Sequence, residues 1–335
     1  MSPYAIVKIM KKKIRVGVLF GGKSAEHEVS LQSARNVINA LDTNKHQITE
    51  ILIDKSGTWP IDNSSKNLRE SFDVIFPVLH GPFGEDGSIQ GLLKVANVPF
   101  VGAGVLGSAV GMDKEIMKRI LRDSGLPIGK FVTVRSHEEI TFVQAKKQLG
   151  LPMFVKPANM GSSVGVSKIK NEKEFKAALV EAFKYDTKVL IEEMIVGREI
   201  ECSVLGNEHP IASVPGEVIP HHEFYSYDAK YIDENGAGLE VPAKLPKNLI
   251  KKVQEYAVKT FLALNCEGLG RVDMFLKKDG SIFINEINTI PGFTKISMYP
   301  KLWAASGMPQ PKLLDNLIKL AVERFKRDQK LRTSK

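Results

Sequence analysis

Two carboxylates, an amide and a guanidinium are brought together by one expected β-hairpin. Two apolar runs flank Asp279-Gly280, a strong signal for a tight turn between two strands. With that pair at the turn, Asp273 lies opposite Glu286 and Arg271 lies opposite Asn288. Opposed carboxylates about 5 Å apart repel each other by roughly 3 kcal/mol at an effective dielectric of 20. We interpret the two carboxylates and the Asn288 oxygen as ligands for a hard cation such as Mg²⁺.

The neighbours of these carboxylates indicate a partly buried site. Arg271, one pleat along the strand, adds a planar positive charge suited to phosphate or to a developing oxyanion. In the same register Leu276 faces Phe283, and Phe275 and Ile284 share the face of the carboxylates. A polar hairpin face in water is the alternative, and the two apolar neighbours argue against it.

A second group of candidate residues forms a loop between two expected strands, within residues 153–165. Lys156 ends the first strand and supplies a point charge. Gly161, Ser162 and Ser163 follow, and small residues let backbone and hydroxyl donors approach phosphate oxygens closely. Taken alone, the pattern fits a plain hairpin loop equally well.

Residues 17–24 match the phosphate-loop pattern GxxxxGK[ST] letter for letter. That pattern needs its four intervening residues to wrap phosphates with backbone N–H groups. Here Val18, Leu19 and Phe20 belong to the expected strand itself, and the loop starts only at Gly21. A P-loop NTPase therefore remains only a distant alternative, in which Lys23 would be essential.

A third segment, residues 189–199, places an extended apolar run beside acids. Such a run can contact adenine through backbone groups while Glu199 contacts a ribose. Alone this signal is weak, because acidic strand ends are common.

Composition and charge exclude several classes of protein. The chain has 335 residues, 43% hydrophobic and 25% charged, so we expect two or three domains of an ordinary globular protein. Its net charge of +9 is concentrated in residues 1–15 and 324–335, which argues against a nucleic-acid groove. No apolar run approaches the ~20 residues of a membrane span. Cys202 and Cys266 lie in apolar settings, as expected of free thiols in a cytoplasmic protein.

Alternation of strands and helices predicts the architecture of the first part. Strands are expected at 14–20, 47–53, 72–79 and 99–101, with helices after the first and third, so residues 1–112 form an open parallel α/β domain. Ligands bind beyond the carboxyl ends of such strands, where the loops 21–30 and 80–87 lie.

The rest of the chain divides into two further parts. Residues 113–196 are expected as a small α/β lobe with strands at 131–134, 153–156, 164–169 and 188–192 and helices at 113–124, 137–149 and 172–184. Residues 197–335 combine antiparallel strands with helices at 247–264 and 311–327, and contain a loop, 223–241, whose glycines suit a mobile lid. The fold class is therefore α/β, with α+β character in the C-terminal part.

These motifs occur in the order and spacing of ATP-grasp enzymes. Within that group, three segments resemble the signatures of D-alanine–D-alanine ligases: GGKSAEHEVS at 21–30, HGPFGEDGSIQG at 80–91, and NTIPGFT with SMYP between 288 and 300. The resemblance covers residues 13–325, and jointly the motifs are highly specific. It implies an ATP-grasp fold that follows an N-terminal parallel domain.

The resemblance also implies an activity and a set of residues. Two D-alanine molecules and ATP would give D-alanyl-D-alanine, a peptidoglycan precursor, through an acyl phosphate, in a cytoplasmic homodimer with two Mg²⁺ ions, or Mn²⁺ in their place. Nucleic acid and membrane insertion are not expected. The implied site residues are Glu26, His80, Ser297 and Met298 for the two amino acids; Lys114, Lys156, Ser162, Ser163, Glu192, Glu193, Ile195 and Glu199 for ATP; Arg271 and Gly292 for the oxyanion; and Asp273, Glu286 and Asn288 for metal.

Two lid residues complete this set. By resemblance Lys230 reaches the γ-phosphate and the substrate, and Tyr231 joins Ser162 and Glu26 across the pocket. Met160 is a departure, since some relatives have an acid there, and it leaves the contacts of that loop open.

Other classes of function are less consistent with the sequence. A nicotinamide-dependent oxidoreductase is opposed by the missing GxGxxG after the first strand, and a basic binding module by the confinement of the charge to the tails. D-lactate or D-serine as the second substrate stays open, because these residues do not distinguish it.

Overall fold

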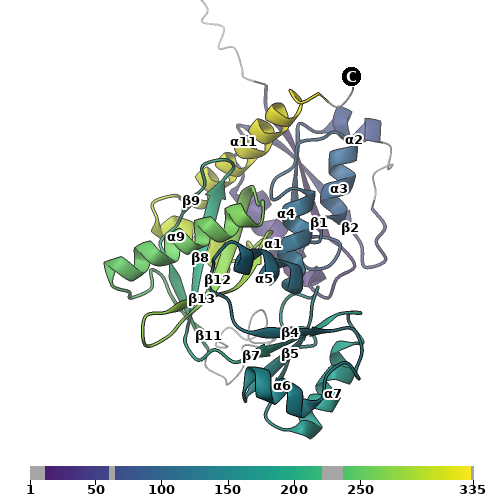
Figure 1. Ribbon diagram of the computed structural model, residues 1–335. Helices are drawn as coiled ribbons and strands as arrows, with labels where there is room; N and C mark the ends of the chain where they lie inside the picture. The colour runs from purple at the N-terminus through teal and green to yellow at the C-terminus, as the bar shows by residue number, and fades with distance from the viewer. Residues whose placement is uncertain (1–11, 60–64, 221–236, 333–335) are drawn as a thin grey trace, which may run out of the picture.

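In the residues that the structure describes, helices cover three separate β-sheets (Figure 1). The computed structural model describes residues 12–59, 65–220 and 237–332. Lys230, Tyr231 and residues 223–236 of the expected lid lie outside the described residues, so the predictions that concern them stay predictions.

The first sheet is parallel, as predicted, with strand order β2-β1-β3. The strand expected at 99–101 is present only as a single parallel bridge between Phe100 and Ile75 of β3. Helices α2 and α4 were not predicted. The elements of this part are β1 (Ile14–Gly21), α1 (His27–Ala40), β2 (His46–Ile53), α2 (Ser65–Ser71), β3 (Val74–Val78), α3 (Ser88–Val95) and α4 (Val105–Met112).

The second sheet is antiparallel, with order β4-β7-β5-β6, and it lies with α6 and α7 at the lower end of Figure 1. The strand expected from residue 164 begins only at Ser167, because residues 162–165 form a turn in which Ser162, Ser163 and Gly165 adopt positive φ values of 50°, 61° and 70°. The phosphate-loop candidate is therefore longer than expected. The elements of this second sheet and its helices are β4 (Phe131–Val134), α6 (Phe142–Leu149), β5 (Met153–Pro157), β6 (Ser167–Ile169), α7 (Glu172–Ala182) and β7 (Val189–Glu193).

The third sheet has the order β11-β10-β8-β12-β13, with β9 paired to β8. The last residues of the expected lid, 237–240, form strand β11. The elements of this third part are β8 (Arg198–Gly206), β9 (Ile211–Ala212), β10 (Gly216–Pro220), β11 (Ala237–Glu240), α9 (Lys247–Ala263), β12 (Gly268–Leu276), β13 (Ile282–Asn288), α10 (Met298–Ala305) and α11 (Gln310–Asp328).

The β12–β13 hairpin has the predicted register at the carboxylates but not at the turn. Leu276 lies opposite Ile282 instead of Phe283, and the turn is closed by the Lys277 N–H, which donates to the Ser281 carbonyl. A register shift between Asp273 and Met274 then compensates for the longer turn.

This shift leaves Asn285 without a partner across the hairpin, which defines a β-bulge. Asp273 consequently faces Glu286, as predicted. Ile284 is fully buried in the core below the sheet, so its expected place beside the carboxylates was wrong.

Two helices connect the sheets through their apolar faces. Leu313 and Leu317 of α11 pack into the core of the first sheet, although α11 ends the described chain. Met117 and Leu121 of α5 (Lys114–Asp123) pack into the core of the third sheet. The predicted boundary at 112/113 falls between α4 and α5, and the division into three domains stays a prediction.

Candidate active site

A cavity of about 200 Å³ opens where loops of the first sheet, the loop after β5 and the β12–β13 hairpin meet. Most of the residues singled out from the sequence line it: Glu26, His80, Lys114, Ser162, Glu199, Arg271, Asp273, Glu286, Asn288, Gly292, Ser297 and Met298. Ser163, Lys156, Glu192, Glu193 and Ile195 do not line this cavity.

Glu26 joins the first sheet to the loop after β5. The hydroxyl of Ser162 donates to Glu26 Oε1, and Glu26 is almost completely buried. A Cβ atom on Gly81 would clash with Glu26 Oε2, and one on Gly161 would lie 2.9 Å from it, so a side chain at either position would displace the carboxylate. Gly81 also adopts a φ of 72°, which favours glycine. Sequence resemblance alone had placed Ser162 beside Glu26.

Lys114 is positioned by the first turn of α5. Asp113 caps this helix by accepting the N–H groups of Glu115 and Ile116. The Lys114 ammonium donates to the Met160 carbonyl at 2.6 Å and lies 3.8 Å from Glu286 Oε2. One predicted phosphate ligand thus contacts both the loop after β5 and the hairpin.

Lys156 and Glu192 form a buried cluster with a lysine that the sequence analysis missed. Lys156 Nζ lies 2.5 Å from Glu192 Oε2, and Lys118 Nζ lies 3.2 Å from Glu192 Oε1. Burial raises the pKa of Glu192, but Lys118 and Lys156 outweigh that effect and hold the pKa below its usual range. Lys118 stands four residues after Lys114 on an amphipathic helix, a spacing that could have revealed it.

The segment predicted for adenine lies at the end of β7. The backbone N–H of Glu193 donates to the Lys130 carbonyl, and its carboxylate accepts the Lys130 N–H at 2.7 Å. The backbone N–H of Glu193 therefore already donates a hydrogen bond within the protein. Ile195 packs against Gly129, where a Cβ atom would come within 3.0 Å of it.

The carboxylates of the hairpin are offset by cations of the protein itself. Arg271 makes two bonds of 2.7 Å to Asp273 and lies 2.8 Å from Glu201. Glu201 lies directly opposite Asp273 on β8, so three acids stand in a row across three strands. The repulsion between Asp273 and Glu286 is therefore offset in part by Arg271 and does not by itself require a metal. Glu201 was missed because the pairing of β8 with β12 is non-local.

The donor set still fits a hard cation. Asp273 and Glu286 offer carboxylate oxygens on one wall of the cavity, and Asn288, whose amide nitrogen donates to Asp273 Oδ2 at 3.0 Å, offers an amide oxygen. Within residues 12–59, 65–220 and 237–332, no three His, Cys, Asp or Glu side chains are grouped to hold a metal by themselves. These donors therefore fit Mg²⁺ that arrives with a nucleotide, whose phosphates supply further oxygens.

The loop after β13 carries Gly292 and is held at its start by two side chains of the first domain. The Ile290 N–H donates to Glu85 Oε1 at 3.0 Å, and His80 Nδ1 lies 3.0 Å from the Ile290 carbonyl. A carbonyl only accepts, so Nδ1 carries the proton. Glu85 also accepts the Gly81 N–H at 2.9 Å.

The same loop is held at its other end by α1. The Phe293 N–H donates to Ser33 Oγ at 3.2 Å, and the Asn36 amide donates to the Phe293 carbonyl at 2.6 Å. His80 Nε2 lies 3.2 Å from Ser33 Oγ, which joins the two ends. Sequence reasoning missed Ser33, Asn36 and Glu85, because polar residues on a helix or in a loop look like ordinary surface residues.

Burial sets the ionisation of this region. It lowers the pKa of His80 to about 4, so the ring is neutral at pH 7. It raises the pKa of Glu85 to about 8, and the neighbouring charge of Glu26 acts in the same direction.

Gly292 and Ser297 lie in close contact. A Cβ atom on Gly292 would lie 2.8 Å from Ser297 Oγ, which accepts the Thr294 N–H at 2.9 Å. Met298 is the first residue of α10 and is buried. The P-loop alternative is not supported, because Gly17–Phe20 belong to strand β1 and Lys23 does not line the cavity.

Comparison with known proteins assigns the fold and the family of this chain. Models described as "D-ala D-ala ligase C-terminus" and "D-ala D-ala ligase N-terminus" match residues 120–319 and residues 15–71 and 60–103. A D-alanine–D-alanine ligase of Oceanobacillus iheyensis is 53% identical over 97% of this chain and 99% of its own length.

Solved structures agree with these matches. The D-alanine–D-alanine ligase of Coxiella burnetii has a TM-score of 0.87 at 39% identity and covers 96% of this chain and 97% of its own. The VanG D-Ala:D-Ser ligase of Enterococcus faecalis has a TM-score of 0.85 at 36% identity, covering 92% and 100%. The Bacillus anthracis D-alanine–D-alanine ligase complexed with ATP has a TM-score of 0.79 at 32% identity, covering 94% and 99%.

In the described residues, three sheets surround a cavity lined by Lys114, Arg271, several acids and a glycine-containing loop, and together with the structural matches they define an ATP-grasp protein, as predicted. Within that class, the chain belongs to the D-alanine–D-alanine ligase family.

Proposed function

We propose that the protein joins two D-alanine molecules into D-alanyl-D-alanine while ATP is converted to ADP and phosphate. The observation that carries this proposal is the meeting of Glu26, Lys114, Arg271 and Gly292 at one cavity, although they come from three distant parts of the chain. An ammonium site, a phosphate site and an oxyanion site are thus adjacent, as a ligase with an acyl phosphate intermediate requires.

The first step is phosphoryl transfer to a carboxylate. Glu26 binds the ammonium group of the first D-alanine, and His80 lines the same pocket. Lys114, Lys156 and the Ser162–Ser163 loop hold the ATP phosphates, while Glu192, Glu193, Ile195 and Glu199 surround adenine and ribose. The carboxylate of the first D-alanine attacks the γ-phosphorus of ATP, the bond between that phosphorus and the ADP oxygen breaks, and an acyl phosphate forms. Such a transfer depends on position and charge neutralisation more than on covalent catalysis.

The second step is attack by an amine. Ser297 and Met298 bind the second D-alanine, whose amine loses a proton and attacks the acyl carbon. Arg271 and the Gly292 N–H stabilise the oxyanion of the tetrahedral intermediate, from which phosphate leaves. Lys230 and Tyr231 are proposed to close over the site.

Asp273, Glu286 and Asn288 are proposed to hold two Mg²⁺ ions, which Mn²⁺ could replace. The metal supplies charge neutralisation at the phosphates. The residues of this chain keep the phosphates beside the first D-alanine and exclude water from the acyl phosphate.

The cellular setting is part of the proposal. No helix in the described residues is long and apolar enough to cross a membrane. Two buried free thiols and the use of ATP support the cytoplasm, where the dipeptide would serve peptidoglycan synthesis. A homodimer is supported by the exposed apolar side chains of Leu92, Val95 and Leu106 on α3 and α4, which a second copy would cover.

An assay of phosphate release with different substrates tests the function. ATP with D-alanine should release phosphate and form the dipeptide, whereas L-alanine should not. Ester formation with D-lactate, or preferred use of D-serine in the second position, would replace the proposed substrate within the same family. Lys23→Ala serves as the control, because it should leave turnover unchanged here and abolish it in a P-loop NTPase.

A further inference from the structure

Helix α5 has two faces with different partners. Its apolar face, with Met117 and Leu121, packs into the core of the third sheet. Its polar face meets the second sheet, where Lys118 contacts Glu192. The second sheet, which carries Lys156 and the Ser162 loop, is thus joined to α5 by charged side chains.

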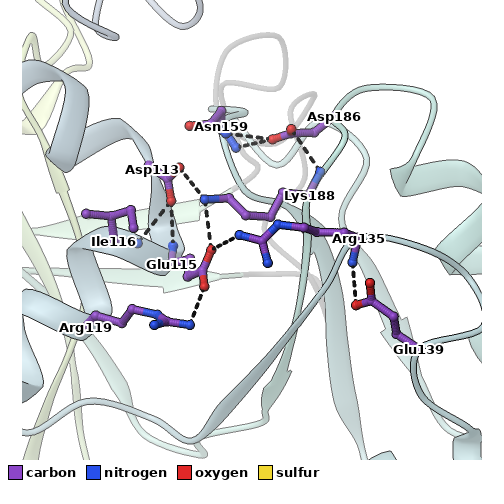
Figure 2. A network of polar contacts seen from close by, with 9 residues as sticks. All are labelled: Asp113, Glu115, Ile116, Arg119, Arg135, Glu139, Asn159, Asp186 and Lys188. Carbon is purple, nitrogen blue, oxygen red and sulfur yellow. Dashed lines mark hydrogen bonds and ion pairs between the residues drawn. The ribbon is translucent and has the colours of Figure 1, made fainter.

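Lys188 is at the centre of the polar contacts at the start of α5 (Figure 2). Its ammonium lies 2.5 Å from Asp113 Oδ2 and 3.0 Å from Glu115 Oε2. Asp113 is also the residue that caps α5. Glu115 is 1% exposed and has further ion pairs with Arg119 and Arg135. Lys188 therefore holds the two acids that form the first turn of the helix.

The backbone around Lys188 reaches the same place. The Lys188 carbonyl accepts the Ala158 N–H at 2.9 Å, and the Ala158 carbonyl accepts the Lys114 N–H at 3.0 Å. Two residues earlier, Asp186 accepts the backbone N–H of Asn159 at 2.8 Å and its amide at 2.9 Å. Residues 186–188 thus fix both the start of α5 and the start of the loop that carries Ser162.

Together these contacts fix the position of Lys114. Its backbone is tied to Ala158, and its ammonium donates to Met160 of the same loop. If α5 rotated away from the second sheet, Lys114 would leave the Ser162 loop and the two would no longer face the same phosphates. Ion pairs between largely buried groups resist such a displacement more strongly than surface pairs do.

We propose that Lys188 is a positioning residue for nucleotide binding, which holds Lys114 and the Ser162 loop in one phosphate site. This proposal rests on the proposed function, because it presumes that both elements bind the phosphates of ATP. Lys188 itself does not line the cavity, so its effect on the nucleotide is exerted through Asp113 and Glu115.

The test compares Lys188→Met with Lys184→Met. Lys184 lies in the same lobe and pairs with Glu181 at 2.6 Å, but both side chains are largely exposed. Lys188→Met should raise the KM for ATP and the Kd for a non-hydrolysable ATP analogue with Mg²⁺ by about tenfold, as loss of a largely buried ion pair predicts. The KM for D-alanine should stay within about twofold, and Lys184→Met should match the wild type.

Two further variants separate positioning from general stability. Lys188→Arg should restore most of the ATP affinity, and Asp113→Asn, which keeps the helix cap but removes the charge, should weaken it as Lys188→Met does. An unchanged Kd in Lys188→Met, or equal rises in the KM values for ATP and D-alanine with a lowered Tm, would overturn the proposal. Because the Kd needs no turnover, it still tests the role of Lys188 if the wild type fails to ligate D-alanine.

Discussion

The two sides of the cavity are held in place by different kinds of contact. The loop from Ile290 to Phe293 is held by His80, Glu85, Ser33 and Asn36, whose side chains bond to its backbone. The second sheet meets α5 mainly through pairs of charged side chains, beside one backbone bond from the Lys114 N–H to the Ala158 carbonyl.

This difference suits the two proposed tasks, which are to stabilise an oxyanion at the Gly292 loop and to bind a nucleotide between α5 and the second sheet. A hydrogen bond to a backbone group weakens steeply when its geometry changes, so the loop with Gly292 is held in one position. The attraction between two charges falls only as the inverse of their distance, so the second sheet can shift slightly over a nucleotide and keep its contacts. The predictions below test this contrast, from the largest expected effect to the smallest.

The largest effect is expected at the hairpin, whose carboxylates are proposed to hold the metal. Asp273→Asn or Glu286→Gln should lower kcat by orders of magnitude with the fold kept, because each removes a carboxylate proposed to hold metal. The Mg²⁺ concentration needed for half-maximal rate should rise as well. Asp279→Asn in the turn of the same hairpin is the matched control and should behave as the wild type. Near-normal turnover in either cavity variant would refute the metal assignment.

A smaller loss is expected when the backbone contacts of the Gly292 loop are removed. Asn36→Ala deletes the donor to the Phe293 carbonyl, and a lost hydrogen bond of this kind is worth about 1 kcal/mol. We expect kcat to fall about fivefold while the KM for ATP stays constant, since the loop is proposed to act on the oxyanion and not on the nucleotide. Asn39→Ala, on the exposed side of α1, is the control. A change confined to the KM for ATP would show that the two sides of the cavity are not separate.

The neutral state of His80 should make the loop contacts sensitive to acid. Burial lowers the pKa of His80 from 6.5 to about 4, so the folded state binds this proton less readily than the unfolded state. Its contribution to stability is fully present above pH 6.5 and is lost as the pH falls toward 4. The loss amounts to at most about 3 kcal/mol. Urea unfolding between pH 7 and 4 should show a shallower decline in His80→Gln than in the wild type, with exposed His209→Gln as the control.

Local patterns in the sequence predicted much of this arrangement, and non-local pairing limited the rest. The facing of Asp273 and Glu286 was predicted from a two-residue turn, yet the real turn is longer and the bulge at Asn285 restores the register. The prediction was thus right about the pair and wrong about its cause, because a bulge leaves no reliable mark in one strand. Glu201 was missed since nothing local shows that β8 lies beside β12.

The contacts between domains show the same limit. Lys118 could have been found from its helical spacing to Lys114, whereas Ser33 and Asn36 occupy positions typical of any amphipathic helix. Their role depends on a loop more than 250 positions away in the chain. The two motifs that carry Glu26 and His80 were recognised by resemblance, and the burial of these residues became visible only in the fold.

The smallest effect concerns salt. Ions screen exposed charges over about 8–10 Å near physiological ionic strength, and they screen buried pairs much less. The pair between Lys188 and Asp113 is largely but not fully buried, with side chains 12% and 18% exposed. Raising KCl from about 0.05 to 0.5 M should therefore weaken ATP binding through this pair by no more than about twofold.

ATP is itself an anion, so the informative quantity is the difference in salt dependence between wild type and Lys188→Met. A slightly steeper dependence in the wild type is expected, while the ratio of kcat between wild type and Asn36→Ala should not change with salt. Salt dependence of that kcat ratio would mean that the Gly292 loop is also held by charge, and the contrast between the two sides would then fail.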